Sequence, residues 1–182
     1  MADYCKLHHL LTQKKNPSLE LNYTHKVIPY LTSLWISEYV NHTSRYELIE
    51  TTLSNFSYLF DIENERLISA WGISKGKITE PRDKARMAGH PLSAGPEYHR
   101  GHAIPHTLGG HTDINLVPQL GAVNIGPFRV LERLAVSTPG SLYFTYWRYS
   151  KSKDNSKIQK PVGIEQGLLI PGHPPDIMYF RN

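Results

Sequence analysis

Glycine and proline are distributed unevenly along the chain. All 13 glycines lie at or beyond Gly72, and so do eleven of the 13 prolines. Both residue types are excluded from long helices and enriched in turns. We therefore expect residues 1–71 to be largely helical and residues 72–182 to form a compact region rich in turns.

Two helices are predicted in the first part of the chain. Apolar residues recur at helical spacing between residues 28 and 40, and again between residues 46 and 59. The intervening segment, residues 41–44, reads as a turn, with Ser44 as the N-cap of the second helix. This periodicity indicates core packing, because a regular apolar stripe is first of all a burial signal.

The second part of the chain predicts one helix and two strands. Asn124 is a favoured N-cap, a proline follows in the first turn, and apolar residues then recur until Thr138. Residues 141–149 are rich in aromatic and β-preferring side chains, and residues 162–170 form a second apolar run. We expect these runs to be strands joined by a loop over residues 150–161.

Charge follows the same division. Residues 1–71 carry six basic and eight acidic side chains, a net charge of −2, whereas residues 72–182 carry fourteen and eight, a net charge of +6. A positive field of this kind permits a polyanionic partner. The basic segment between Gly72 and Pro96 is therefore a candidate for phosphate contacts, although such a loop can equally be a solvated surface.

The sequence shows no sign of a membrane span, a secretory signal or a cysteine-based metal site. No apolar run approaches the length of a membrane span, and residues 1–15 show no secretory signal, so the expected location is the cytoplasm without membrane association. The only cysteine, Cys5, cannot form an internal disulfide or a multi-cysteine zinc site.

A group of polar residues between Tyr98 and Leu134 suggests chemistry. Five of the ten histidines fall between His90 and His111, and asparagine, glutamine and glutamate follow them at intervals. Hydrolysis of a phosphodiester needs a general base with a pKa near neutrality, oxygen ligands for a hard cation, and a cationic side chain to steady the phosphate. These requirements are met in turn by His102, by Asn124 and Glu132, and by Arg100.

At these residues the sequence resembles the DNA/RNA non-specific endonucleases of the ββα-metal (His-Me finger) superfamily, the group of the Serratia and Anabaena nucleases. Their signature is Asp-Arg-Gly-His, then Asn-x-x-Pro-Gln, then an asparagine and a glutamate on the following helix. This chain has His99–His102, Asn115–Gln119, Asn124 and Glu132. The resemblance covers about a fifth of the chain.

The resemblance implies a role for each matched residue. His102 is expected to be the general base, Asn124 a direct magnesium ligand and Glu132 a water-mediated metal partner, with Mn²⁺ able to replace Mg²⁺. Asn115 is counted among the catalytic residues. Asn115 and Gln119 are both expected to support the geometry of the site. The implied activity is cleavage of DNA and RNA with little sequence preference, leaving 5′-phosphates.

The substrate-binding residues are less constrained by the motif. The family's phosphate-steadying arginine lies upstream, where Arg66, Arg82 and Arg86 are candidates; we predict that Arg82 and Arg86 bind substrate. His106 and Gln119 are predicted to contribute to substrate binding. His106 and His111 flank Gly109 and Gly110, and we expect both histidines at the mouth of the site.

One position departs from the signature. His99 stands where the family has aspartate, and imidazole can accept a hydrogen bond but brings no negative charge. Either the subfamily tolerates this change or metal affinity is weakened. Related bacterial domains include toxins held by immunity proteins, so DNA, RNA and an inhibitor protein are the expected partners. The sequence leaves the biological role open among a toxin, a defence effector and a scavenging enzyme.

The combined prediction is an α+β protein. Residues 1–71 form a mainly helical N-terminal segment, and residues 72–182 form a ββα-metal nuclease domain in which a hairpin carrying His102 packs against the helix begun by Asn124. The predicted protein is a metal-dependent endonuclease. The alternatives are a catalytically weakened nucleic-acid-binding or protein-interaction module on the same fold, and a zinc-stabilised structural domain. The sequence leaves the oligomeric state open.

Overall fold

The computed structural model describes residues 2–12, 22–81, 85, 88–89, 91, 94–151 and 159–182. Its centre is a six-stranded antiparallel sheet in the order β1-β2-β3-β6-β7-β8. The strands are β1 (Leu48–Leu53), β2 (Phe56–Asp61), β3 (Arg66–Ile73), β6 (Leu142–Arg148), β7 (Gly163–Leu169) and β8 (Asp176–Arg181).

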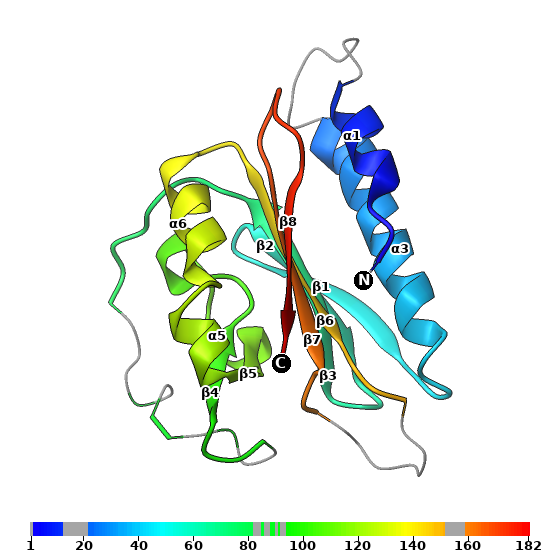
Figure 1. Cartoon of the computed structure of the whole chain (residues 1–182), viewed down its shortest axis with the longest axis vertical. Helices are drawn as coiled ribbons and strands as arrows, with labels where there is room; N and C mark the ends of the chain where they lie inside the picture. Colours follow the sequence, from blue (N-terminus) through cyan, green and yellow to red (C-terminus); the bar gives the residue numbers. More distant parts are fainter. Residues whose placement is uncertain are drawn as a thin grey trace.

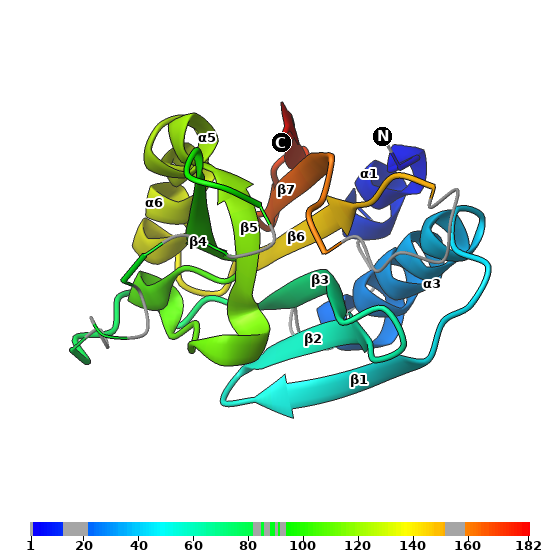
Figure 2. The ribbon, with the colours of Figure 1, turned by 90° about the horizontal axis from the view of Figure 1, so that it is seen from below.

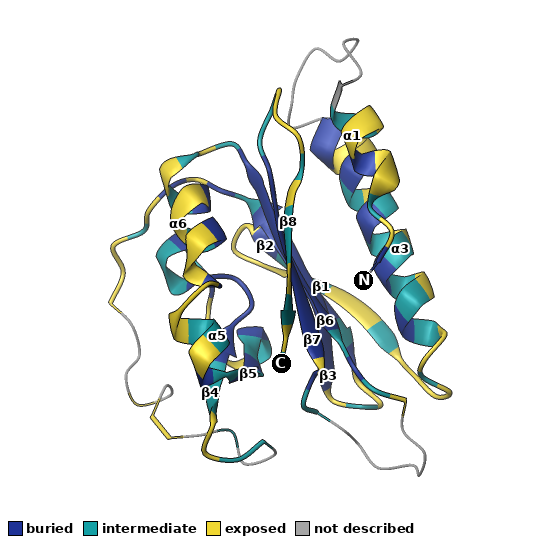
Figure 3. Ribbon diagram, viewed as in Figure 1, coloured by how far each residue is buried: buried dark blue, intermediate teal, exposed yellow. Residues whose placement is uncertain are grey.

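Helices cover both faces of this sheet (Figures 1 and 2). The central strands β3, β6 and β7 are consequently buried along almost their whole length, whereas the edge strands β1 and β8 remain largely open to solvent (Figure 3). Strands covered on both faces read as continuous apolar runs rather than as alternating patterns. The sequence of β6, Leu-Tyr-Phe-Thr-Tyr-Trp-Arg, has this character.

One face is covered by the N-terminal helices α1 (Cys5–Thr12), η1 (Tyr23–Val27) and α3 (Ile28–Val40). Trp35 of α3 is the anchor of this layer. Its ring lies 5.7 Å from that of Trp71 on β3 and 5.2 Å from that of Phe144 on β6, measured between ring centroids. Aromatic pairs at such spacing add packing energy to the burial of a large apolar surface.

The opposite face carries a second, two-stranded sheet and two helices. Strands β4 (Tyr98–His102) and β5 (Leu116–Leu120) pair antiparallel, and α5 (Gly121–Ile125) and α6 (Arg129–Ser137) follow them. The short helical turns η2 (His106–Leu108) and η3 (Asp113–Asn115) lie in the connection between the two strands. Phe128, which is fully buried, packs against Trp147 and Phe180 and so joins α6 to the large sheet.

Asn182 fastens the small sheet to the large one. Its side-chain oxygen accepts a hydrogen bond of 2.7 Å from the Leu120 amide. Its side-chain nitrogen donates to the carbonyls of Pro118 and Pro161, both at 2.9 Å. One residue directly after β8 therefore fixes the position of β5, and with it the hairpin that carries His102.

Several predictions of secondary structure are confirmed. The fold is α+β, α3 covers residues 28–40, and the strands expected at 141–149 and 162–170 are β6 and β7, which pair antiparallel. His102 ends β4, which pairs with β5 as the predicted hairpin, and the last predicted helix ends at Ser137. Most of the loop predicted at residues 150–161 lies outside the described residues.

The helix predicted over residues 46–59 is wrong. This segment forms β1 and β2, which pair across a tight turn at Ser54 and Asn55, and Ser44 is not a helix cap. The N-terminal segment is helical only up to Val40 and then contributes three strands to the central sheet. The boundary predicted between residues 71 and 72 falls inside β3.

The predicted start of the last helix is also wrong. Asn124 lies within α5, and α6 begins only at Arg129, after a break at Gly126. Asn124 and Glu132 therefore belong to two helices rather than to one. Among the described residues, no helix combines the length and apolar character that a membrane span requires.

Candidate functional site

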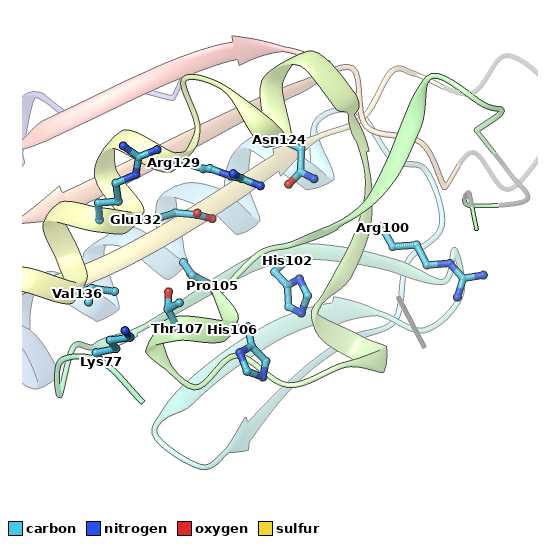
Figure 4. Close-up of a pocket in the computed structure, with 11 residues that line it drawn as sticks. Lys77, Arg100, His102, Pro105, His106, Thr107, Asn124, Arg129, Glu132 and Val136 are labelled. Atoms are coloured by element: carbon cyan, nitrogen blue, oxygen red, sulfur yellow. The ribbon is translucent and has the colours of Figure 1, made fainter. Parts of the chain in front are cut away.

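A cavity of about 590 Å³ opens between the end of β4, the loop after it, and the helices α5 and α6 (Figure 4). Five of the residues singled out from the sequence line it, together with six others. The lining consists of Lys77, Arg100, His102, Pro105, His106, Thr107, Asn124, Arg129, Glu132, Arg133 and Val136.

His102 reaches the cavity because of the local structure of β4. It is the last residue of the strand and pairs with Leu116 of β5. Its neighbour Gly101 must lack a side chain, since a Cβ atom there would lie 2.3 Å from the side-chain oxygen of Gln119. The close contact between Gly101 and Gln119 thus fixes how near β4 lies to β5. The imidazole of His102 is 8% exposed, and its ring centroid lies 6.3 Å from that of His106.

Asn115 holds the loop that follows His102. Its side-chain oxygen accepts from the Ile104 amide at 2.7 Å, and its side-chain nitrogen donates to the carbonyls of Ile104 and His111, both at 2.8 Å. The side chain is completely buried and does not line the cavity. Its amide holds the loop after His102 from a buried position outside the cavity, as the expected supporting role requires. The part of Asn115 in catalysis stays a prediction.

Asn124 enters the cavity from α5. Its side-chain nitrogen lies 3.4 Å from Nδ1 of His99, which reaches it from β4. Figure 4 shows the carbonyl oxygen of Asn124 on the side of α6, toward Glu132 and Arg129. The contact with His99 therefore involves the amide nitrogen and leaves the oxygen, the possible metal ligand, directed into the cavity.

Helix α6 presents two different faces. Leu131 and Ala135 are buried against the large sheet. Arg129, Glu132 and Arg133 lie on the cavity side, at the three- and four-residue spacing that places side chains on one face of a helix. The carboxylate of Glu132 points from α6 toward the space occupied by Asn124 and His102 (Figure 4).

The cavity is predominantly cationic. Lys77, Arg100, Arg129 and Arg133 line it, and among the described residues Glu132 is the only carboxylate in the lining. Burial, reinforced by the charge of Glu132, holds the pKa of Tyr143 well above its usual range, so this neighbouring phenol stays neutral. Such a charge balance favours a phosphate or another anion.

The donor set fits a hard divalent cation held by few protein ligands. The amide oxygen of Asn124 and the carboxylate of Glu132 face the same space, and a magnesium ion bound by one or two protein oxygens completes its coordination with water. Within the part of the chain that the structure describes, no group of three histidine, cysteine, aspartate or glutamate side chains is placed to hold a metal.

Several predicted site residues lie elsewhere. Gln119, predicted to bind substrate, is completely buried beneath Gly101 and does not line the cavity. Arg66 is buried near Tyr149, with its guanidinium carbon 4.9 Å from the ring centroid, so it is not the phosphate-contacting arginine. Arg82 and Arg86 lie outside the described residues. His111 lines a different pocket.

Arg129 and Arg133 line the cavity but were not predicted from the sequence. Both lie on the predicted helix and share the helical face of Glu132. Charged residues at intervals of three and four along that helix were the signal for them. The phosphate-contacting arginine was instead predicted upstream of His102. Lys77 was assigned only to a generally basic loop.

No protein-family model matches the chain, and no curated protein matches it. Among solved structures, one chain in the crystal structure of the EndoG/EndoGI complex, a study of the mechanism of EndoG inhibition, is similar to this chain. The TM-score is 0.48 at 14% sequence identity, and the alignment covers 80% of this chain and 78% of that chain.

Proposed function

We propose that this protein is a metal-dependent nuclease that hydrolyses phosphodiester bonds in DNA and RNA, and that its core is of the ββα-metal type. The observation that carries the proposal is the convergence of an imidazole, an amide oxygen, a carboxylate and several cations on one cavity. Each side chain meets one chemical requirement of phosphodiester hydrolysis.

The cationic residues bind the substrate phosphate. Arg129 and Arg133 project from α6 on one side of the cavity, and Lys77 comes from the segment after β3. Arg100 lies at the outer edge of the cavity, and its guanidinium points away from His102 (Figure 4). Arginine pairs with phosphate oxygens through two parallel hydrogen bonds, which fixes the orientation of the phosphate as well as its position. Contacts with phosphate alone carry no sequence information, which agrees with cleavage of low sequence preference.

His102 acts as the general base. Its position at the end of a paired strand, beside a loop fixed by Asn115, holds the imidazole in place with little freedom to reorient. It takes a proton from a water molecule as the water oxygen forms a bond to phosphorus. The bond between phosphorus and the 3′ oxygen then breaks, and that oxygen is protonated from solvent.

Asn124 and Glu132 would hold the metal ion, Mg²⁺ or Mn²⁺. When bound, a divalent cation neutralises charge on the phosphate and on the departing oxygen. His99 orients Asn124 through the contact of 3.4 Å between Nδ1 and the amide nitrogen. The imidazole that replaces the signature aspartate thus meets the same residue that presents a ligand to the metal.

The test is cleavage of supercoiled plasmid DNA and of a folded RNA by the purified protein in Mg²⁺, in EDTA, and after Mn²⁺ is added back. We expect both substrates to be degraded in Mg²⁺, protected in EDTA and degraded again with Mn²⁺. A preparation carrying His102→Ala controls for contaminating nucleases.

Two outcomes would overturn the proposal. Cleavage that persists in EDTA would exclude the metal-dependent reaction. Binding of plasmid in a gel-shift assay without cleavage under any metal condition would instead identify a nucleic-acid-binding module, the alternative raised by His99.

A further inference from the structure

A second pocket, of about 190 Å³, lies beside the proposed active site. We name it the turn pocket, because Ser54 and Asn55 of the β1–β2 turn form one of its walls. The remaining lining comes from the segments around Lys75 and Ile78 and around Leu108 and His111. Nothing in the proposed reaction uses these residues.

The turn pocket has an apolar floor and a polar rim. Phe56 and Leu108, which are 2% and 3% exposed, form the floor together with the partly buried Ile73 and Ile78. The side chains around the rim are exposed and polar: Ser54, Asn55, Lys75, Glu80 and His111. The rim therefore offers hydrogen-bond donors and acceptors around an apolar floor, the combination that binds a flat heterocycle.

Hydrogen bonds hold the rim in position. Ser54 Oγ and His111 Nε2 lie 2.7 Å apart, so the imidazole is tied to the turn. Lys75 Nζ donates to Asn55 Oδ1 at 2.7 Å. Ser54 has a φ of +57°, the left-handed conformation that the first position of a two-residue hairpin turn requires. The tight turn thereby aims Ser54 at His111.

The turn pocket and the active-site cavity are formed by the same two chain segments. Lys77 and Thr107 line the cavity, and the next residue in each segment, Ile78 and Leu108, lines the turn pocket. The Ile78 amide donates to the Thr107 carbonyl at 2.9 Å and joins the segments between the two openings. Because adjacent Cα atoms are about 3.8 Å apart, the walls of the cavity and of the turn pocket meet along these two segments.

We infer that the turn pocket binds one unpaired nucleobase of the nucleic-acid strand whose phosphate occupies the active-site cavity. The inference rests on the proposed function and adds to it a preference for single-stranded substrate. The pocket is of a suitable size, since a cavity of about 150 Å³ holds one benzene ring. Base pairing and stacking in a duplex keep the base from entering, whereas an unpaired base can turn outward.

His111 supplies a stacking surface for the base, and Lys75 and Asn55 supply donors to its edge. Stacking of a base on an aromatic side chain is sequence-tolerant, because every base has a flat face. This mode of binding is therefore compatible with cleavage of low sequence preference.

The test measures binding in EDTA, where no cleavage occurs. Fluorescence anisotropy gives the Kd of a labelled single-stranded hexanucleotide for the wild type, His111→Ala and Lys75→Gln. Lys6→Gln, on the exposed side of α1 across the sheet, is the matched control for charge. We expect His111→Ala to weaken binding about fivefold or more, Lys75→Gln to weaken it by a smaller factor, and Lys6→Gln to leave it unchanged.

A second arm separates base binding from phosphate binding. Hexanucleotides with abasic residues throughout should bind the wild type about fivefold or more weakly, and His111→Ala should cause no further loss with them. An equal loss on intact and abasic oligonucleotides would overturn the inference, as would unchanged binding of the intact one.

The turnover of bis(4-nitrophenyl) phosphate, which is too small to reach both sites, distinguishes the two proposals. It should be the same in His111→Ala as in the wild type. A wild-type protein that binds oligonucleotides as described but hydrolyses no phosphodiester would contradict the proposed function. The binding of a base in the turn pocket would still be supported.

Discussion

Arg129 and Arg133 lie one turn apart on α6, with Glu132 between them in sequence. Both side chains are exposed on the rim of the cavity. In the proposed function they contact phosphate oxygens and make no contact with base edges. Their contribution should therefore depend strongly on salt concentration and little on sequence.

Replacing Arg129 with glutamine should weaken nucleic-acid binding roughly tenfold at low salt, because a charge-assisted hydrogen bond to phosphate is lost. The slope of log Kd against log salt should fall by about one. Arg45→Gln, in the turn before β1, is the matched control and should change neither value. A loss that varies with oligonucleotide sequence would show that Arg129 reads bases instead.

Of the residues singled out from the sequence, Arg100, His102, His106, Asn124 and Glu132 line one cavity, whereas Asn115 and Gln119 do not. Their chemical roles stay predictions. The spacing could not show that Gln119 is buried, because burial there depends on contact across the hairpin with Gly101. Arg129 and Arg133 carried a readable signal, the shared helical face, that the motif does not include.

At the scale of single elements, the β1–β2 hairpin is the main departure from the sequence prediction. Its apolar residues fit a helical period, but Ile49 and Leu53 are 39% and 42% exposed on the edge strand, so periodicity there did not report burial. The adjacent Thr51 and Thr52 and the Ser54–Asn55 turn are the competing signals for a hairpin. Residue spacing alone cannot distinguish these alternatives in a short apolar run.

The helix start at Asn124 failed for a different reason. The single turn of α5 packs on β4 and β5, and Gly121 allows this close approach, since a Cβ there would lie 2.9 Å from His99 Nε2. The five-residue sequence of α5 carries no pattern that would reveal this packing against β4 and β5. Pro127 was predicted in the first turn of the helix, but it precedes Phe128, the N-cap of α6, which begins at Arg129.

Asp61 joins the hairpin to the N-terminal helical layer. Its buried carboxylate accepts hydrogen bonds from the Tyr39 hydroxyl at 2.5 Å, the Glu47 amide at 3.0 Å, and both the amide and the side-chain nitrogen of Asn64, at 3.3 and 2.7 Å. Asp61→Ala would leave the buried Tyr39 hydroxyl and the partly buried Glu47 amide without this acceptor, and would remove a charge opposite the buried Arg66. We expect a loss of about 3 kcal/mol or more in the free energy of unfolding.

Urea denaturation measures this loss. Glu63→Ala, an exposed residue of the same turn, is the matched control and should change stability by less than about 0.5 kcal/mol. Equal effects of the two substitutions would remove Asp61 from its structural role.

At the scale of the whole molecule, the core is unusually rich in tyrosine. Tyr23, Tyr58, Tyr143 and Tyr149 are buried on or against the central sheet. Burial raises the pKa of Tyr23 and of Tyr58 to about 12, and raises the pKa of the other two further. In the unfolded chain each phenol titrates near its usual value of about 10.

Stability should therefore fall in alkali. Below pH 10 both states keep the phenolic protons and these residues give no pH dependence. Above pH 10 the unfolded chain loses protons that the fold retains, so the free energy of unfolding should fall by about 1.4 kcal/mol per pH unit for each such tyrosine. Denaturant titrations at pH 9, 10 and 11 measure the slope; a constant free energy of unfolding across that range would contradict the burial of these phenols.

The central claim is that His102 activates water against a phosphate held in the cavity between β4 and α6, and steady-state hydrolysis by His102→Ala tests it most directly. Plasmid cleavage in Mg²⁺ should fall by about 10² to 10⁴ fold, while the Kd for DNA in EDTA and the unfolding midpoint stay close to those of the wild type. His42→Ala, in the exposed turn after α3, should cleave as the wild type does. Cleavage by His102→Ala within a few fold of the wild-type rate would contradict the account.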